Sequence, residues 1–368
     1  MAAVLALSLA GCGGPAERGA AVSGEASGGE TDVTTVAVRA DLVVSQRLPD
    51  EVVYDILTAI LEDTSLFGSE SDSVGVETAA SVKSVPYHAG AAGYYAEAGY
   101  AVDAVMEAAD TADPAGDTAD TAATAGDAAD TAATAGDTAD AAAAGADEVR
   151  ELTIATGNSS GMYYAAGTAM AEAIEAKTGI PVTVLSTGGS QSNLEAIEAG
   201  EADIGFVQAD VLHYAWNGER LFEGSPVSGF AVAAALYPEA VQIITLNPDI
   251  RTVSDLRGRK VSIGEAGSGV YYNALDVLDA YDMTEEDIVA VYQSFSTVSD
   301  SLYDGIIDAA FIVAGFPTAA VSDLAELEEV ILLPVDGDEG ARLLESSEYY
   351  EEIIIPAGTY GETGEDPE

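Results

Sequence analysis

The chain has few of the residues that build metal and redox sites. Its 368 residues include one cysteine, Cys12, and two histidines, His88 and His213. A single cysteine excludes an intramolecular disulfide and a site made of several thiolates. The histidines stand far apart, with no cysteine or carboxylate at metal-ligand spacing, so we assign them structural roles. We therefore expect no metal site and no cofactor.

Basic residues are equally scarce. Lys and Arg number 12 against 64 Asp and Glu, which gives a formal net charge of −52. Binding to nucleic acid or to an anionic membrane surface requires a basic patch, so this charge excludes both as partners. We interpret the acidity as adaptation of the surface to high salt, because a Debye length of about 3 Å at molar salt screens most of the repulsion among the carboxylates.

Long apolar runs are also missing. No later segment approaches the roughly 20 apolar residues that a membrane-spanning helix needs. The short apolar stretch 2–9 is followed by Leu9-Ala10-Gly11-Cys12, which resembles a lipoprotein signal ending in a lipobox. We expect residues 1–30 to be a signal and flexible leader, with Cys12 lipidated after cleavage before it; the alternative is a chance cysteine in an Ala/Leu-rich leader. Lipidation places the protein outside the cytoplasm, anchored to the membrane.

A low-complexity segment divides the chain. Residues 104–149 contain no aromatic and no basic residue, and a ten-residue unit at 121–130 repeats at 131–140. Alanine favours helix, but the recurring Asp, Thr and Gly do not, and no face of such a helix is apolar. The segment is predicted to be an acidic, solvated and disordered linker.

The folded material is predicted to be α/β. Short β-branched runs alternate with Gly/Ser loops and Ala-rich amphipathic runs, which is typical of a mostly parallel sheet covered by helices. The predicted strands are 152–156, 181–185, 203–208, 241–246 and 260–263, and the predicted helices are 162–177, 192–199 and 270–281. Because the pattern restarts after residue 238, we expect two similar lobes.

The two ends of the chain complement each other. Residues 33–46 predict a strand with only a leader before it, whereas 353–368 run into a polar acidic loop with no strand to follow. We expect a circular permutation in which residue 368 originally led on to residue 31. In this arrangement 31–103 and 150–238 form the first lobe and 239–368 the second and the hinge return, with one covalent connection between the lobes, at 236–241.

Several motifs, in mutual order, resemble the TAXI family of solute receptors of tripartite ATP-independent periplasmic (TRAP) transporters. They are residues 156–164, 186–190 with Asn193, 199–208, 235–239, 255–258 with 264–269, 304–308, and 86–90 with Tyr94 and Tyr95. The resemblance covers about 150–368 and 31–100. It implies a type II periplasmic-binding-protein fold, in which two α/β lobes close on a small organic acid such as glutamate or a dicarboxylate. It also implies TRAP membrane permease subunits as partners.

Three Gly/Ser loops, at 157–161, 188–192 and 267–269, each open a helix. A helix N-terminus offers free backbone N–H groups and a positive dipole end, which suit a carboxylate. One such loop alone is more often an ordinary cap, but three together favour a binding site. The predicted ligand-binding residues in these loops are Asn158, Ser159, Ser160, Gly188, Gly189, Ser190, Gly267, Ser268 and Gly269.

Four further residues are candidate ligand contacts. Gln208 ends a predicted strand and is either a hydrogen-bonding partner of the solute or a satisfied edge residue. Tyr163, Tyr237 and Tyr271 either wall the pocket or pack in the core.

Nothing in the sequence favours catalysis. The loop at 157–161 resembles a phosphate loop, but no Lys-Ser/Thr follows it, and no Gly-x-Ser-x-Gly elbow is present. We therefore predict an extracytoplasmic receptor without enzymatic activity that captures a small organic anion. The alternative is a domain that senses such a ligand for a signalling receptor.

Overall fold

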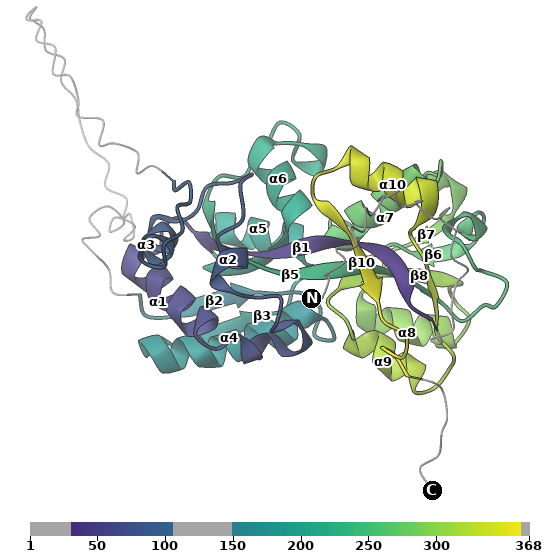
Figure 1. The fold of residues 1–368 in the computed structure, drawn as a ribbon, viewed down its shortest axis with the longest axis horizontal. Coiled ribbons are helices and arrows are strands. Elements are labelled where there is room, and N and C mark those ends of the chain that lie inside the picture. Colours follow the sequence, from purple (N-terminus) through teal and green to yellow (C-terminus); the bar gives the residue numbers. More distant parts are fainter. Residues whose placement is uncertain (1–30, 106–148, 362–368) are drawn as a thin grey trace, which may run out of the picture.

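The computed structural model describes residues 31–105 and 149–361, so Cys12 and most of the predicted linker lie outside the described residues. These residues form two α/β lobes side by side, built on one ten-stranded sheet (Figure 1). The strand order is β3-β2-β4-β1-β5-β8-β6-β7, with β10 paired to β1 and β9 to β5. The predicted type II periplasmic-binding-protein fold is confirmed.

The first lobe contains three parallel strands flanked by helices. Its strands are β2 (Leu152–Ala155), β3 (Val182–Leu185) and β4 (Ile204–Gln208). Its helices are α1 (Asp50–Leu61), α2 (Val76–Ala79), α3 (Ala89–Glu97), α4 (Met162–Thr178), α5 (Ser190–Ala199) and α6 (Ala209–Asn217), with 3₁₀ turns η1 (Thr64–Glu70) and η2 (Arg220–Phe222). The predicted alternation of strand, loop and helix is confirmed here.

The second lobe repeats this plan. Its strands are β6 (Lys260–Ser262), β7 (Val289–Val291), β8 (Ala309–Ala314), β9 (Ile331–Leu333) and β10 (Tyr350–Ile355). Its helices are α7 (Gly269–Ala280), α8 (Phe295–Tyr303), α9 (Ala319–Ala325) and α10 (Gly337–Ser346), with 3₁₀ turns η3 (Val253–Leu256) and η4 (Glu285–Asp287).

Two long antiparallel strands, β1 (Val33–Ser45) and β5 (Phe230–Thr245), run through both lobes. Residues 40–44 of β1 pair with β4 of the first lobe, and residues 33–38 pair with β10 of the second. Likewise, residues 240–245 of β5 pair with β8 of the second lobe. The lobes are therefore joined by two covalent crossings that pair with each other.

The expectation of a single crossing is wrong. At about 3.4 Å per residue, the 13 residues of β1 are long enough to serve both lobes. Its first part contributes Val36 and Val38 to the core of the second lobe, so the segment assigned to the first lobe from residue 31 in fact begins in the second. The crossing lies where Val38 pairs with Glu239, next to a bulge between Arg39 and Asp41.

The first and last described segments lie side by side. Val33 pairs with Ile355 in the β1–β10 ladder, and the backbone N–H of Ala357 donates to Asp32 Oδ1 at 2.9 Å. The two ends of the folded chain must lie close together if they are to be linked directly, and these contacts bring them together. The circular permutation itself stays a prediction.

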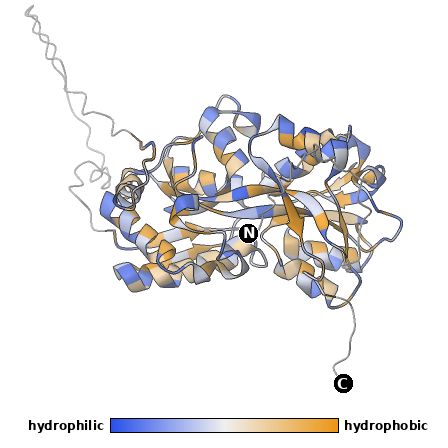
Figure 2. Cartoon of the chain, viewed as in Figure 1, coloured by the Kyte–Doolittle hydropathy of each residue, from blue (hydrophilic) through white to orange (hydrophobic). Residues whose placement is uncertain are grey.

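Apolar residues gather on the strands and on the helix faces that cover them (Figure 2). The first lobe has one core, which includes the fully buried Tyr87, Tyr95 and Phe206. The hydroxyls of both tyrosines are satisfied, since Tyr87 donates to Ala79 O at 2.8 Å and Tyr95 to Ala233 O at 2.7 Å. The second lobe has two core clusters, one on each face of its sheet.

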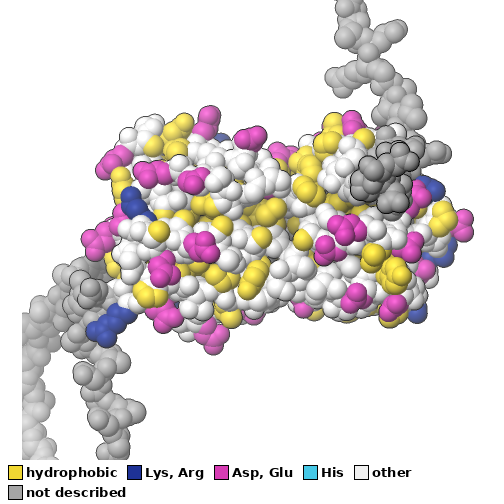
Figure 3. All heavy atoms as spheres, turned by 90° about the horizontal axis from the view of Figure 1, so that it is seen from below, with side chains coloured by type: hydrophobic (Ala, Val, Ile, Leu, Met, Phe, Trp, Pro, Cys, Tyr) yellow, Lys and Arg dark blue, Asp and Glu magenta, His cyan; other side chains and the backbone are white. Residues whose placement is uncertain are grey.

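The surface is acidic and carries few cations. Figure 3 shows acidic side chains spread over both lobes, with the basic side chains mostly near the two ends of this face. Among the described residues, no helix is both long enough and apolar enough to cross a membrane.

Candidate functional site

A cavity lies between the lobes, where the loops that follow the parallel strands meet. Binding at the carboxyl ends of strands is the general rule for open α/β sheets. The volume of this cavity, counted as the space that the centre of a water molecule can occupy, is about 60 Å³. The lining residues are Gly157, Asn158, Gly161, Met162, Tyr163, Gly188, Gly189, Ser190, Gln208 and Glu239 from one side, and Gly264, Glu265, Ser268, Gly269, Val270, Gln293, Ser294, Phe295, Val313 and Ala314 from the other.

Four helix N-termini converge on this cavity, two from each lobe. The first residues of α4, α5, α7 and α8 and the residues that precede them all line it. In α4, α5 and α8 no side chain caps the first turn, whereas in α7 Ser268 Oγ accepts from Tyr271 N at 3.2 Å. Free N–H groups and four positive dipole ends therefore point to one small volume.

Glycine allows the two lobes to touch. Gly269 of α7 faces β4, and a Cβ atom there would collide with Gln208 Oε1 and lie 3.1 Å from Ser190 Oγ. Gly189 has φ of 112°, a conformation that favours glycine. Because these contacts bridge the cleft, the structure shows the lobes closed against each other.

Asn193 of α5 holds the first-lobe loops in place. Its buried Nδ2 donates to Thr156 O at 2.6 Å and to Phe206 O at 2.7 Å, which ties together the ends of two strands. Its Oδ1 accepts from Thr187 Oγ1 at 2.6 Å, and that hydroxyl accepts from Gly189 N at 3.0 Å. The backbone groups at the start of α5 are thus fixed before a solute arrives.

The polar side chains of the cavity are neutral or acidic. Of the described residues that line it, none is Lys, Arg or His, whereas Glu239 and Glu265 both carry carboxyls. Glu239 is 2% exposed, and its Oε2 accepts from Tyr163 OH at 2.8 Å. Burial raises the pKa of Glu239 to about 8, and burial also raises the pKa of Glu265.

Eight of the thirteen predicted site residues line the cavity. They are Asn158, Tyr163, Gly188, Gly189, Ser190, Gln208, Ser268 and Gly269. Gln208 is 2% exposed, and its Oε1 has no hydrogen-bond partner among the described residues. Tyr163 stacks on Phe206 with ring centroids 4.9 Å apart, so it serves the core and the cavity together.

The other five lie away from the cavity wall. Ser159 does not line it, and the N–H and hydroxyl of Ser160 bind Asn158 Oδ1 at 3.1 and 2.7 Å. Gly267 faces Gln191. Tyr237 is fully buried in the first-lobe core, where its ring centroid lies 6.0 Å from that of Phe67, and it does not line the cavity.

Tyr271 is also displaced from the cavity. It is the third residue of α7, and its hydroxyl donates to Glu285 Oε2 at 3.2 Å, outside the lining. Neighbouring positions in a helix point in different directions, so Gly269 and Tyr271 do not share a face.

Two lining features escaped the sequence analysis. The first is the start of α8 at Ser294 and Phe295, which follows β7 with a capping-type serine. The second is Glu239, a single acidic residue inside the long apolar strand β5. An acidic residue in such a run is an available signal, because charged residues are seldom buried without a role.

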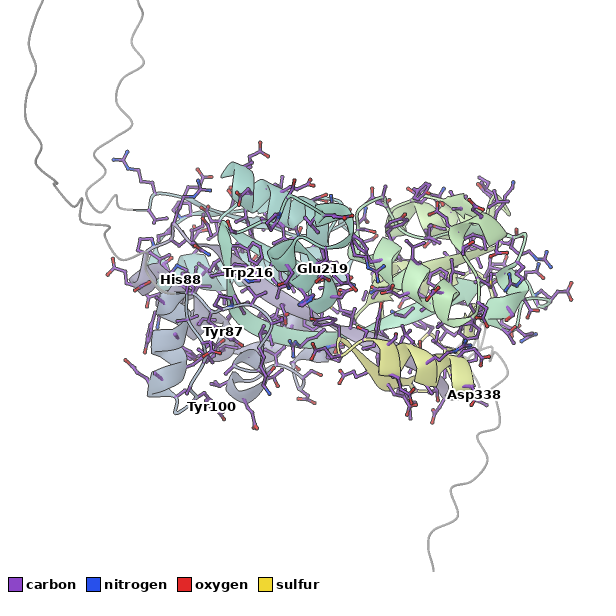
Figure 4. All side chains as sticks on the ribbon, turned by 90° about the horizontal axis from the view of Figure 1, so that it is seen from above. Tyr87, His88, Tyr100, Trp216, Glu219 and Asp338 are labelled. Atoms are coloured by element: carbon purple, nitrogen blue, oxygen red, sulfur yellow. The ribbon has the colours of Figure 1, made fainter. Side chains whose placement is uncertain are left out.

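The histidines lie outside the cavity. His88 is 4% exposed in the first lobe (Figure 4), where its Nδ1 accepts from Gly90 N at 3.1 Å and so caps α3. His213 packs against Tyr349 with ring centroids 5.1 Å apart. Trp216 lies edge-on to Phe230 in the first-lobe core.

Solved binding proteins resemble parts of this structure. An alkanesulfonate-binding protein from Xanthomonas axonopodis pv. citri, bound to MOPS, is 20% identical over 51% of this chain and 61% of its own, with a TM-score of 0.35. An amino acid ABC transporter substrate-binding protein from Streptococcus pneumoniae, bound to L-arginine, is 13% identical over 54% of this chain and 86% of its own, with a TM-score of 0.32. The chain spans about three fifths of the length of the alkanesulfonate-binding protein.

The family assignment rests on the sequence rather than on these structures. The profile of the NMT1-like family matches residues 17–99 and 154–367, on both sides of the predicted linker. These ranges contain both strands that join the lobes and every residue that lines the cavity. The chain belongs to the NMT1-like family.

Proposed function

We propose that this protein is an extracytoplasmic solute receptor that closes its two lobes on a small organic anion and delivers it to a membrane transporter. The observation that carries the proposal is the convergence of four helix N-termini, two from each lobe, on one interlobe cavity. Such termini bind carboxylates through backbone N–H groups without any basic side chain. Contacts from both lobes to one ligand favour the closed form over the open one.

The size of the cavity supports a small solute. The centre of a water-sized group can occupy only about 60 Å³ of it, which suits a small solute rather than a large one. The residues that line the cavity include no basic side chain, so backbone N–H groups and helix dipoles must compensate the charge of a small organic acid. Glutamate, 2-oxoglutarate and C4-dicarboxylates are the solutes to test first.

The partner and location are part of the same proposal. The resemblance to TAXI receptors supports permease subunits of a TRAP transporter as the partner, and the sequence around Cys12 supports a lipid anchor. The net charge of −52 supports a surface adapted to high salt.

Gentle purification followed by native mass spectrometry tests the receptor function directly, because a trapped solute adds its own mass. A protein that carries no solute and gives no heat with any of the acids in calorimetry would contradict the proposal.

Ser268→Ala is expected to weaken solute binding by about 1 to 2 kcal/mol, or roughly 5- to 30-fold. The substitution removes a hydroxyl from the cavity wall and the cap that orders the first turn of α7. Isothermal calorimetry measures the affinity and thermal unfolding measures the loss of the cap.

Thr252→Ala is the matched control for this change. Thr252 caps η3 of the same lobe in a capping box, but it is exposed and does not line the cavity. We expect it to lower stability to a similar extent and to leave affinity unchanged. Equal affinity in the wild type and Ser268→Ala would show that the α7 terminus does not contact the solute.

A further inference from the structure

Glu239 occupies a special position in the cavity, because it lies on the strand that joins the lobes. It pairs with Val38 at the point where β1 and β5 cross from one lobe to the other. Its side chain is 2% exposed and turned into the cavity, where Tyr163 OH donates to Oε2 at 2.8 Å. A solute held by the four helix N-termini therefore lies next to this carboxyl.

The groups around Glu239 supply no positive charge. Those that act on it come from α4, β4, α6 and η1; they are Tyr163, Gln208, Asp210 and Glu70. Tyr237 of β5, whose own pKa is raised mainly by burial and also by the charge of Glu239, lies within reach as well. The other acidic residue of the cavity lining is Glu265. Burial and, to a lesser extent, the charges of Asp210 and Glu70 raise the pKa of Glu239 to about 8, although hydrogen bonds from Tyr163 and Gln208 oppose the shift. The carboxyl is therefore mostly protonated at neutral pH.

Gln208 supports a polar contact at the same place. It is 2% exposed, lines the cavity, and its Oε1 lacks a partner among the described residues. An amide oxygen accepts hydrogen bonds, so Gln208 Oε1 matches a donor such as a hydroxyl of the solute. If Glu239 were ionised, it would repel a buried anion strongly, because two like charges lie close together in a dry site and no cationic side chain offsets them.

We propose that Glu239 is protonated when it recognises the solute. Its carboxyl O–H donates a hydrogen bond to an oxygen of the anion, so the closed complex holds one proton together with the anion. This inference rests on the proposed function and specifies how the site compensates the solute's charge. The proton stays on Glu239, and no bond of the solute changes. Glu239 thereby selects anions over cationic solutes.

The proposal predicts a defined pH dependence of binding. The dissociation constants of 2-oxoglutarate and succinate are measured by calorimetry from pH 6 to 9.5 at one fixed high salt concentration. Both acids are close to fully ionised above about pH 7, and 2-oxoglutarate already is at about pH 6, so a change in affinity above about pH 7 reports on the protein. We expect constant affinity below about pH 7 and a loss that approaches about tenfold per pH unit above about pH 8. Calorimetry in buffers of different ionisation enthalpy should then show little proton uptake at about pH 7, where Glu239 is already protonated, and uptake that approaches one proton per bound solute above about pH 9.

Two variants separate Glu239 from other acidic residues. Glu239→Gln keeps a hydrogen-bond donor but cannot ionise, so it should bind the anions with affinity independent of pH. Glu172→Gln changes an exposed carboxyl on α4, outside the cavity, and should keep the wild-type pH profile. The proton-uptake measurement on the wild type stands even if Glu239→Gln fails to fold.

The experiment distinguishes failure of the inference about Glu239 from failure of the proposed function. Anion binding that stays constant to pH 9.5 without proton uptake would overturn the role of Glu239 while leaving the receptor function intact. The same follows if amino acids bind more tightly as the pH rises towards 8, because an ammonium group would then be pairing with ionised Glu239. Failure of every acid to bind at every pH would overturn both.

Discussion

Gly269→Val is expected to weaken solute binding by at least about 100-fold while both lobes stay folded. The valine side chain occupies the space that Gln208 Oε1 and Ser190 Oγ fill when the lobes touch. Both of these groups are buried, so they have little room to retreat. Opening the cleft relieves the clash, and a protein confined to the open form loses affinity in proportion to the lost closed population.

Calorimetry with the tested acids gives the affinity, and small-angle scattering with and without solute reports closure. Gly93→Val is the matched control, because Gly93 is an exposed position of α3 whose added Cβ meets nothing within 4 Å. It should raise helix stability slightly, because valine has a higher helix propensity than glycine, and leave affinity intact. Wild-type affinity and wild-type compaction in Gly269→Val would show that the solute does not require the closed contact.

Arg39→Met is expected to destabilise the fold by about 3 to 5 kcal/mol at pH 8. Arg39 Nε lies 2.8 Å from Asp41 Oδ1 where β1 crosses between the lobes, and the Asp41 side chain is 0% exposed. Without the guanidinium the carboxylate is a buried charge without compensation. Arg257→Met removes an ion pair of similar length, 2.9 Å, that is exposed to solvent, and should cost less than about 1 kcal/mol.

The loss should shrink in acid. Burial raises the pKa of Asp41 to about 6 even with Arg39 present, and removal of the cation raises it further. The folded state then keeps a proton that the unfolded state has lost above about pH 4, so stability falls as the pH rises through this window. Urea unfolding at pH 5 and pH 8 measures the difference. Adding Asp41→Asn should restore much of the stability at pH 8, and a double variant as unstable as Arg39→Met would refute the account.

Most of the site's framework was accessible from the sequence, because local signals build it. The loop before Met162 and the loop before Ser190 follow β-branched strands and contain the glycines and serines of helix starts, and the structure has helices there. α5 begins at Ser190, two residues before the predicted start, which turns a predicted loop residue into the first residue of the helix.

Long-range geometry was not accessible in the same way. β5 begins at Phe230, eleven residues before the predicted strand, because alanines and Pro238 disfavour a central strand in any local reading. Whether Tyr237 packs in the core or reaches the cavity depends on the bulged pairing of β5 with β1, which only the assembled sheet determines. For the same reason, sequence spacing could not distinguish Gly269, on the cavity wall, from Gly267 and Tyr271, which lie beside it.

The paired crossing of β1 and β5 places Glu239 where the chain passes between the lobes, so a closing motion about this crossing would have Glu239 at its pivot. Atoms at a pivot move little, whereas the termini of α5 and α7 travel with their lobes. A solute can therefore contact Glu239 equally in the open and the closed receptor, and such a contact adds affinity without favouring either form. Glu239 thus contributes to the selection of the solute, whereas the N-termini of α5 and α7, which move with their lobes, supply the driving force for closure.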